Sequence, residues 1–152
     1  SKKNKIKIIQ QTHKSNTDNL KNIYDEAEIE NIIFDFEENL VDLISQSDLC
    51  ITRAGASTLA ELSIMNKPFL TIPLVSAKDN HQFENANFYQ NLGCCWIMSQ
   101  KDFNEVNLEK FLDHIIMNKS EYNAKKNNLE KHNFQNSWNN VNQKILETIN
   151  EN

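Results

Sequence analysis

The sequence predicts an α/β fold, in which a doubly wound parallel sheet is covered by helices on both faces. Short apolar and β-branched runs alternate with stretches whose apolar residues recur at helical spacing, a pattern typical of strands joined by helical crossovers. Strands joined in this way run parallel, because each right-handed crossover returns the chain to the same end of the sheet. The chain has 152 residues, 39% of them hydrophobic, which is enough for the core of one domain. We therefore expect a single Rossmann-like domain over residues 1–152.

The first half of the chain predicts three strand–helix pairs. The strands are short apolar runs: Lys5–Gln11, Ile32–Phe36 and Leu49–Thr52. The first strand leads into a polar, helix-compatible stretch, Thr17–Ala27, and the helices after the other two carry apolar residues on one face: Leu40–Ser47 and Ser57–Met65. The last of these helices directs Leu59, Leu62 and Met65 inward, and it ends before Pro68.

The second half predicts two more strands and four more helices. Phe69–Leu74 and Cys94–Met98 are expected strands, and the helix His81–Leu92 between them ends at Gly93. The clearest amphipathic helix has apolar residues at i, i+3, i+4, i+7 and i+8, namely Leu108, Phe111, Leu112, Ile115 and Ile116. A further helix is expected at Ser120–Lys131. The last is expected to be anchored by an apolar face that carries Trp138, Val141, Ile145, Leu146 and Ile149.

The overall charge disfavours binding to nucleic acid. A formal net charge of -5 and a pI near 5.4 argue against a sequence-independent binder of nucleic acid, which needs a basic face to displace counterions from phosphates. The first residues do not form a signal peptide, and no apolar run approaches the roughly 20 residues of a membrane span, so a cytoplasmic protein is expected. Asparagine is abundant in the last third of the chain, where the persisting apolar periodicity favours a compositional bias over disorder.

The cysteines and the histidines outside the motifs are expected to have structural or surface roles. Cys50, Cys94 and Cys95 lie in or beside apolar runs, and their spacing fits neither a zinc site nor a disulfide framework. We expect them to be buried thiols. The histidines expected at the surface are His13, His114 and His132.

Ligands of a doubly wound sheet bind beyond the carboxyl ends of its strands. The segments in question are His13–Ser15, Glu37–Asn39, Arg53–Thr58 and Val75–Gln82. The third is distinctive, because a strand enters a glycine turn that opens directly into a helix. Free N–H groups and the positive end of the dipole at a helix start attract anions, and Gly55 lets the backbone approach a phosphate closely.

Hydroxyl side chains follow that turn at Ser57 and Thr58, and they offer further hydrogen bonds to a phosphate. The alternative is purely structural. Thr58-x-x-Glu61 also fits a capping box, in which these side chains satisfy only the first turn of their own helix.

The fourth segment leads from Pro73, at the end of a strand, through a polar loop into a helix that starts with His81 and Gln82. Asp79 or Asn80 is expected to be its N-cap. The side-chain amide of Gln82 both donates and accepts hydrogen bonds, which suits the vicinal hydroxyls of a sugar. The alternative is an ordinary polar helix start.

Together these segments resemble the donor-binding signature of bacterial glycosyltransferases with the GT-B fold, and most closely those of family 28. The resemblance covers nearly the whole chain. Its core is Arg53-Ala-Gly-Ala-Ser-Thr-Leu-Ala-Glu61, Lys67-Pro68, Ile72-Pro73 and Asp79-Asn-His-Gln-x-x-Asn85-Ala86. It implies the C-terminal domain of an inverting enzyme that transfers N-acetylglucosamine from UDP-N-acetylglucosamine to lipid I, forming lipid II of peptidoglycan. It implies no cofactor and no metal ion, and no Asp-x-Asp metal motif occurs in the sequence.

The resemblance also implies which residues bind the donor. Helix N–H groups contact the diphosphate, Glu61 contacts the ribose hydroxyls, and His81 with Gln82 contacts the sugar. Phe36 and Glu37 match the backbone position beside uracil, where Glu37 replaces an apolar residue. The full set is Phe36, Glu37, Arg53, Gly55, Ala56, Ser57, Thr58, Leu59, Ala60, Glu61, His81 and Gln82.

Some parts of the family pattern do not occur in this sequence. The nucleotide domain of the family opens with a strand and a glycine-rich loop, without which the strands here would flank a gap. Its N-terminal domain supplies the acceptor site, the membrane-facing surface and the general base. We therefore expect no catalytic residue in this chain and no transfer by the chain alone. Contact with the lipid acceptor, at the inner face of the plasma membrane, is expected only through that other domain.

Two alternatives stay open from the sequence. The first is a donor-binding domain or subunit of another GT-B glycolipid glycosyltransferase. The second is a non-catalytic or epimerase-like module that binds a nucleotide sugar.

Overall fold

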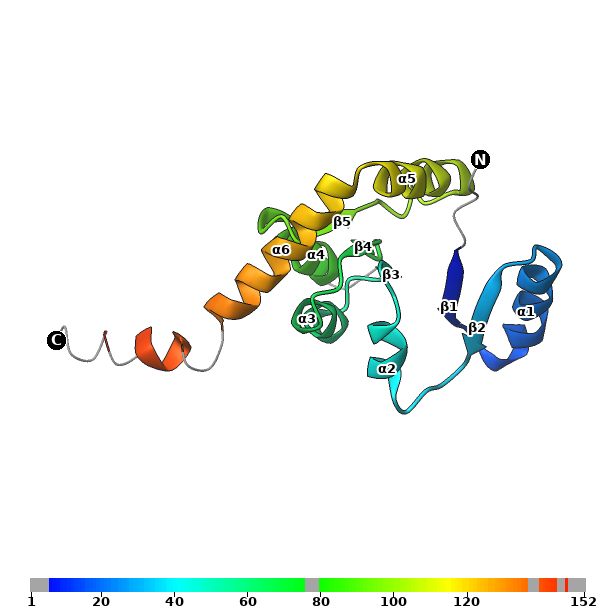
Figure 1. The fold of residues 1–152 in the computed structure, drawn as a ribbon, viewed down its shortest axis with the longest axis horizontal. Helices are drawn as coiled ribbons and strands as arrows, with labels where there is room; N and C mark the ends of the chain where they lie inside the picture. Colours follow the sequence, from blue (N-terminus) through cyan, green and yellow to red (C-terminus); the bar gives the residue numbers. More distant parts are fainter. Residues whose placement is uncertain (1–5, 76–79, 137–139, 145–146, 148–152) are drawn as a thin grey trace. The chain divides into compact units, whose positions relative to one another are not determined.

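Figure 1 shows the computed structural model of the chain, which describes residues 6–75, 80–136, 140–144 and 147. These residues belong to two compact units, Ser1–Ser47 and Asp48–Asn152. The expectation of one domain stays a prediction. The expected last helix is described only at residues 140–144, which are helical, and at residue 147, and Trp138 lies outside the described residues.

In its described residues, the unit Ser1–Ser47 contains two strands and three helices. They are β1 Lys7–Gln11, the 3-10 helix η1 Lys14–Asn16, α1 Thr17–Glu26, β2 Glu30–Phe34 and α2 Leu40–Ser45. β1 and β2 are parallel and pair from Lys7 opposite Glu30 to Gln11 opposite Phe34. Lys7 Nζ also forms an ion pair with Glu30 at 3.1 Å. The expected order of strand, helix, strand and helix is confirmed.

The second strand ends two residues earlier than the sequence predicts. The expected strand was Ile32–Phe36, whereas β2 ends at Phe34. Thr12 N donates to Phe34 O at 2.8 Å, and beyond it the backbone oxygen of Asp35 accepts from the side-chain Nε2 of Gln11 at 2.9 Å. Phe36 therefore lies in the connection between β2 and α2.

The unit Asp48–Asn152 has a three-stranded parallel sheet and four helices within its described residues up to 136. They are β3 Cys50–Thr52, α3 Ala56–Ile64, β4 Phe69–Thr71, α4 His81–Asn91, β5 Cys95–Ile97, α5 Glu105–Met117 and α6 Lys119–Gln135. The strand order is β3-β4-β5. The described strands of the two units form two separate sheets.

Every strand and helix expected between residues 48 and 136 is confirmed, but the strands are shorter than predicted. β4 was expected to reach Leu74 and ends at Thr71. Pro73 has no N–H to donate to a ladder, and Leu74 N donates to a side chain instead. Ile72 N still donates to Thr52 O at 2.8 Å, and the ladder between β3 and β4 ends at the proline that follows.

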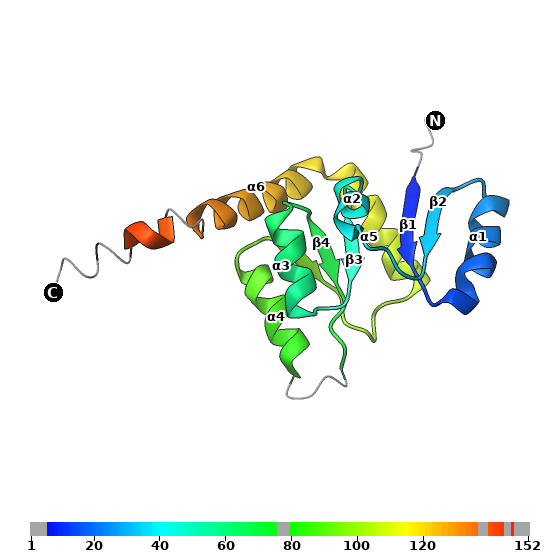
Figure 2. The ribbon, with the colours of Figure 1, turned by 90° about the horizontal axis from the view of Figure 1, so that it is seen from below.

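Helices cover both faces of the sheet in this unit. Phe69 of β4 faces α4, and its ring lies 5.6 Å from that of Tyr89. Trp96 of β5 stands opposite Leu70 and packs on the other face, 5.5 Å from the ring of Phe111 in α5. Figure 2 shows α3 and α4 running side by side. The buried apolar core is Ala54, Leu59, Leu62, Phe69, Leu70, Ile72, Ala86, Cys94, Cys95, Ile115 and Leu129.

Asparagine side chains of α6 hold the ends of two other helices. Asn128 Nδ2 donates to Gly93 O at 3.1 Å after the end of α4, and Asn133 Nδ2 donates to Ser63 O at 2.6 Å near the end of α3. Gly93 has a φ of 70°, and an added Cβ would lie 2.6 Å from Asn128 Nδ2. Glycine is thus required where α4 ends, as the sequence predicts. Two of the asparagines in the asparagine-rich part therefore have defined structural roles.

The cysteines are less uniform than expected. Cys94 and Cys95 are buried, as predicted, and burial raises the pKa of the Cys95 thiol to about 12. Cys50 is only half-buried, because it lies in β3, an edge strand among the described residues. Thiols with raised pKa values are poor nucleophiles, so these data give Cys94 and Cys95 a packing role.

Two of the three surface histidines are confirmed and one is not. His13 is exposed and accepts a hydrogen bond from Ser15 N at 3.3 Å. His114 is exposed in α5. His132 was expected at the surface but is half-buried, because its ring packs edge-on against the rings of Phe88 and Tyr89 at 5.9 and 6.1 Å.

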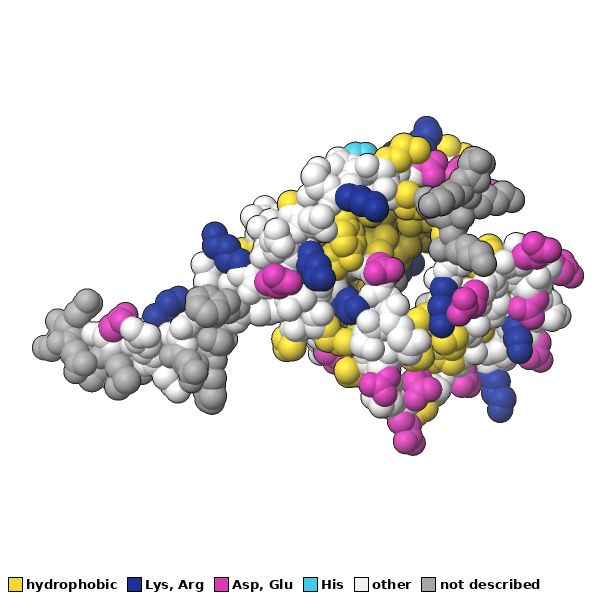
Figure 3. Space-filling view, viewed as in Figure 1, with side chains coloured by type: hydrophobic (Ala, Val, Ile, Leu, Met, Phe, Trp, Pro, Cys, Tyr) yellow, Lys and Arg dark blue, Asp and Glu magenta, His cyan; other side chains and the backbone are white. Residues whose placement is uncertain are grey.

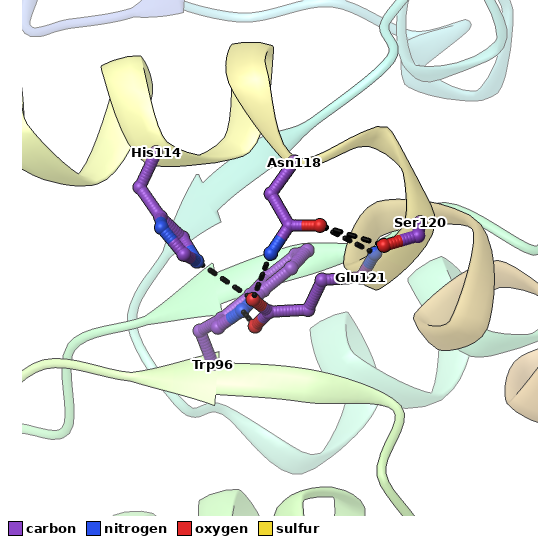
Figure 4. A network of polar contacts seen from close by, with 5 residues as sticks. All are labelled: Trp96, His114, Asn118, Ser120 and Glu121. Atoms are coloured by element: carbon purple, nitrogen blue, oxygen red, sulfur yellow. Dashed lines mark hydrogen bonds and ion pairs between the residues drawn. The ribbon is translucent and has the colours of Figure 1, made fainter.

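A carboxylate of α6 joins the sheet to α5 (Figure 4). Glu121 Oε1 accepts a hydrogen bond from Trp96 Nε1 at 2.6 Å, and its Oε2 lies 2.6 Å from His114 Nε2. Asn118 Nδ2 donates to the same carboxylate at 3.4 Å, and Lys125 Nζ lies 5.3 Å from the centre of the Trp96 ring. The Trp96 N–H first, and His114 second, lower the pKa of Glu121 below its usual value.

The lowered pKa of Glu121 predicts a pH-dependent contribution to stability. A carboxyl with a lowered folded-state pKa stabilises the fold above its unfolded pKa of about 4.3, and this stabilisation is lost as pH falls through the folded pKa. The melting temperature of the wild type should therefore exceed that of Glu121→Gln at pH 7, and the difference should shrink as the pH falls below the unfolded pKa. Thermal unfolding at pH 7 and at a series of lower pH values measures it. Glu109→Gln, at an exposed position of α5, is the matched control. A difference for Glu121→Gln that does not change with pH would contradict the prediction.

The surface is mixed in charge on the face drawn in Figure 3. Lys and Arg side chains there are interspersed with Asp and Glu, and they form no continuous basic patch. None of the helices in the described part of the chain is long and apolar enough to cross a membrane.

Candidate functional site: the turn before helix α3

The turn between β3 and α3 leaves three amide groups without partners. Gly55 is the N-cap of α3, with φ -67° and ψ 133°, and its carbonyl accepts the first helical bond from Leu59 N at 3.0 Å. Within the described residues, the amides of Ala56, Ser57 and Thr58 have no hydrogen-bond partner and no side chain caps the helix. Three N–H groups at the positive end of the helix dipole are thus free to bind an anion.

The capping box that the sequence also permitted is wrong. A capping box needs its threonine at the N-cap, whereas Gly55 has that position and Thr58 is the third residue of α3. The chain's own packing does not explain the glycine, because its φ is ordinary and an added Cβ would meet Thr58 Oγ1 at 3.7 Å, a normal contact. A glycine at this position leaves room for a ligand to approach the backbone closely.

Two side-chain amides of α4 hold this turn in place. Gln82 Oε1 accepts hydrogen bonds from Leu74 N at 2.9 Å and from Ala54 N at 3.3 Å. Asn85 Nδ2 donates to Ala54 O at 3.0 Å. Ala54 is fully buried, and both of its backbone groups are satisfied by these two side chains. The two segments that carry the sequence motifs are therefore in direct contact.

Arg53 lies at the carboxyl ends of all three strands of this sheet. It follows β3, and its Nη1 donates to Ile72 O, just after β4, and to Gln100 Oε1, after β5, both at 3.2 Å. The side chain is exposed. Gln100 was not predicted to belong to the site, although its position shortly after the fifth strand was the signal that would have found it.

A surface pocket of about 330 Å³ adjoins the start of α3. Its lining residues are Ala56, Glu84, Asn85, Phe88 and Tyr89. Aromatic rings and an amide line the pocket, and the first residue of α3 borders it. Space for a ligand thus lies beside the helix start that carries the free amides.

Residues 1–141 match the family model described as glycosyltransferase family 28 C-terminal domain. The chain belongs to family 28. It is 50% identical over all of its 152 residues to a Pelagibacter ubique protein named UDP-N-acetylglucosamine--N-acetylmuramyl-(pentapeptide) pyrophosphoryl-undecaprenol N-acetylglucosamine transferase. A Campylobacter jejuni protein of the same name is 41% identical over 111 residues.

Solved structures agree with this family. The crystal structure of Acinetobacter baumannii MurG matches with a TM-score of 0.71 and 26% identity, over 84% of this chain and 37% of that one. The spinosyn forosaminyltransferase SpnP shares the fold, with a TM-score of 0.56 and 12% identity over 98% of this chain and 44% of that one. The chain spans 43% of the Pelagibacter ubique relative and 32% of the Campylobacter jejuni relative. These matches show that the family 28 chain has the GT-B type of α/β fold.

Most of the predicted donor-binding residues of the family 28 chain lie around the turn before α3. Ser57, Thr58 and Glu61 are exposed on the first two turns of the helix. The side chain of Leu59 is fully buried and its N–H forms the first helical bond, so its expected contact with the nucleotide sugar stays a prediction. Ala60 is half-buried.

The remaining predicted residues lie at the start of α4 and in the other unit. His81 is the exposed first residue of α4. Asn80 is at the N-cap, with a φ of 59°, but its side chain makes no capping bond, and Asp79 lies outside the described residues. Phe36 and Glu37 are exposed residues of the unit Ser1–Ser47, so their position beside uracil stays a prediction.

Titratable side chains of the described residues form no group of three that would hold a metal ion. The positive charge near the turn comes from Arg53 and from the helix start. The chemistry available at this site of the family 28 chain is therefore binding of a phosphate group by N–H donors and a guanidinium.

Proposed function

We propose that this family 28 domain binds UDP-N-acetylglucosamine and forms the donor half of an enzyme that transfers N-acetylglucosamine to lipid I. The names of its relatives support this function. The observation that carries the proposal is the set of three free amides at the start of α3, next to an exposed arginine. A diphosphate is the part of the donor that such a site would bind.

The proposed reaction is an inverting displacement. A base from the acceptor half takes the proton of the acceptor hydroxyl, whose oxygen forms a bond to the anomeric carbon. The bond from that carbon to the diphosphate oxygen breaks, and its electron pair leaves with UDP. Negative charge grows on the diphosphate, where the amides of residues 56–58 and the guanidinium of Arg53 would stabilise it without having to reorganise.

The other donor contacts belong to the same proposal. Glu61, one turn into α3, accepts hydrogen bonds from the ribose hydroxyls, and His81 with Gln82 contacts the sugar. The lipid-linked acceptor and the membrane are contacted through the acceptor half, with the enzyme at the cytoplasmic face of the plasma membrane. Nucleic acid is not a partner.

Calorimetric titration of the chain with UDP-N-acetylglucosamine, UDP-glucose, UDP and GDP tests the function. We expect UDP-N-acetylglucosamine to bind at least about tenfold more tightly than UDP-glucose, a difference of about 1.4 kcal/mol. UDP should bind and GDP should not. Preference for UDP-glucose would favour another glycolipid glycosyltransferase, and absence of any UDP binding would refute a donor-binding domain.

A further inference from the structure

The turn before α3 contains a glycine, and glycine does not hold a backbone conformation by itself. Gly55 lacks a Cβ, so the peptide groups on either side of it have more rotational freedom than those of other residues. The free amides bind a diphosphate well only if they already point in one direction, because ordering them on binding costs free energy. Some other part of the chain must therefore fix the turn.

We propose that Asn85 is a positioning residue, which orients the Gly55 amide and the start of α3 toward the donor diphosphate through its hydrogen bond to Ala54 O. This inference rests on the proposed function, since it assumes that the turn binds a diphosphate. Asn85 lies on α4, whereas the turn connects β3 to α3. The bond, at 3.0 Å, links segments that are 31 residues apart in the chain.

The geometry of the peptide group explains how this bond acts. The Ala54–Gly55 peptide is planar and trans, so its C=O and its N–H point in opposite directions. When Asn85 Nδ2 holds the carbonyl of Ala54, the N–H of Gly55 is directed away from Asn85. That N–H has no partner among the described residues. It is therefore a further free N–H of the turn, and the bond from Asn85 fixes its direction.

A second amide fixes the preceding peptide. Gln82 Oε1 accepts from Ala54 N, so the Arg53–Ala54 peptide cannot rotate independently. Both peptides of the fully buried Ala54 are thus held by α4. Without Asn85, the only peptide of the turn left free to rotate is the one that leads into Gly55.

Asn85 also lines the pocket beside Ala56, so a direct contact with the sugar is the competing explanation. The two explanations differ in which part of the donor they affect. A positioning role acts on the diphosphate and changes the affinity for UDP and for UDP-N-acetylglucosamine alike. A sugar contact changes only the affinity for UDP-N-acetylglucosamine.

The test compares Asn85→Ala with Asn87→Ala, a variant of the same helix at a half-buried position whose side chain makes no hydrogen bond to the described residues. Calorimetry with UDP and UDP-N-acetylglucosamine should give a loss of roughly tenfold for both ligands in Asn85→Ala. Uridine binding, followed by NMR, should be unchanged, and Asn87→Ala should resemble the wild type for all three ligands. A loss confined to UDP-N-acetylglucosamine, or no loss at all, would overturn the proposal.

Two further measurements keep the result interpretable. In the unliganded chain, the amide resonances of Gly55 and Ala56 should shift and broaden in Asn85→Ala and not in Asn87→Ala. Unchanged resonances in Asn85→Ala would overturn the positioning role, even if the wild type failed to bind UDP. Failure of the wild type to bind UDP would by itself refute the proposed function and not the fixing of the turn. If Asn85→Ala does not fold, Asn85→Asp keeps the shape without the donor, and Asn87→Asp is its control for charge.

Discussion

Replacement of Glu61 by alanine should weaken UDP binding by about 10- to 100-fold and leave the fold intact. The expected loss corresponds to about 1.5–3 kcal/mol for hydrogen bonds to a charged acceptor. Glu61 is exposed in the second turn of α3, and its carboxylate forms no hydrogen bond or ion pair within the described residues. Gly55 is the N-cap of that helix, so Glu61 does not complete a capping box either. Its carboxylate is therefore available to two neighbouring ribose hydroxyls.

Calorimetry with UDP and thermal unfolding of the same samples measure the two halves of this prediction. Glu61→Gln should bind UDP with intermediate affinity, because the amide keeps one acceptor oxygen but loses the charge. Glu109→Ala removes an exposed glutamate from α5 and is the matched control for net charge. A clear drop in melting temperature together with normal UDP binding would show that Glu61 stabilises the helix and does not recognise ribose.

The fold was predictable because its apolar runs have the lengths and periods of buried strands and amphipathic helices. The helix that carries Ile115 was found from its spacing alone, and it is α5. The strand ends were not predictable in the same way. β2 and β4 stop where side chains of Gln11 and Gln82 bond to backbone groups, and such long-range bonds leave no periodic pattern in the sequence.

The candidate site was predictable in its location and less so in its internal contacts. A glycine between a strand and a helix marked the turn at Gly55, and the structure leaves its amides free. The choice between an anion site and a capping box depended on whether α3 starts at residue 56 or 59, a difference that local sequence does not resolve. The contacts of Asn85 with Ala54 and of Gln100 with Arg53 join residues far apart in the chain, so only the fold reveals them.

Gln82 should prove to have two separable roles, one for each end of its amide. Both groups that its Oε1 contacts are backbone N–H donors, at Ala54 and Leu74, so the oxygen must face them. Its Nε2 makes no hydrogen bond to the described residues. Gln82→Ala should leave both N–H groups unpaired, which costs about 1–3 kcal/mol each when such groups are buried. For a chain of this size the melting temperature should fall by about 5–15 °C.

Gln82→Glu separates the two roles, because a carboxylate still accepts from both N–H groups but has no hydrogen to donate. The melting temperature of Gln82→Glu should stay close to that of the wild type. If Nε2 of Gln82 donates to the sugar, the preference of this variant for UDP-N-acetylglucosamine over UDP should fall by about tenfold. Gln90→Glu, exposed on the same helix, introduces the same charge away from the turn. Thermal unfolding and calorimetry with both ligands decide the matter. Equal destabilisation by glutamate and alanine would mean that the oxygen of Gln82 does not hold the turn, and unchanged ligand preference would remove its nitrogen from the sugar site.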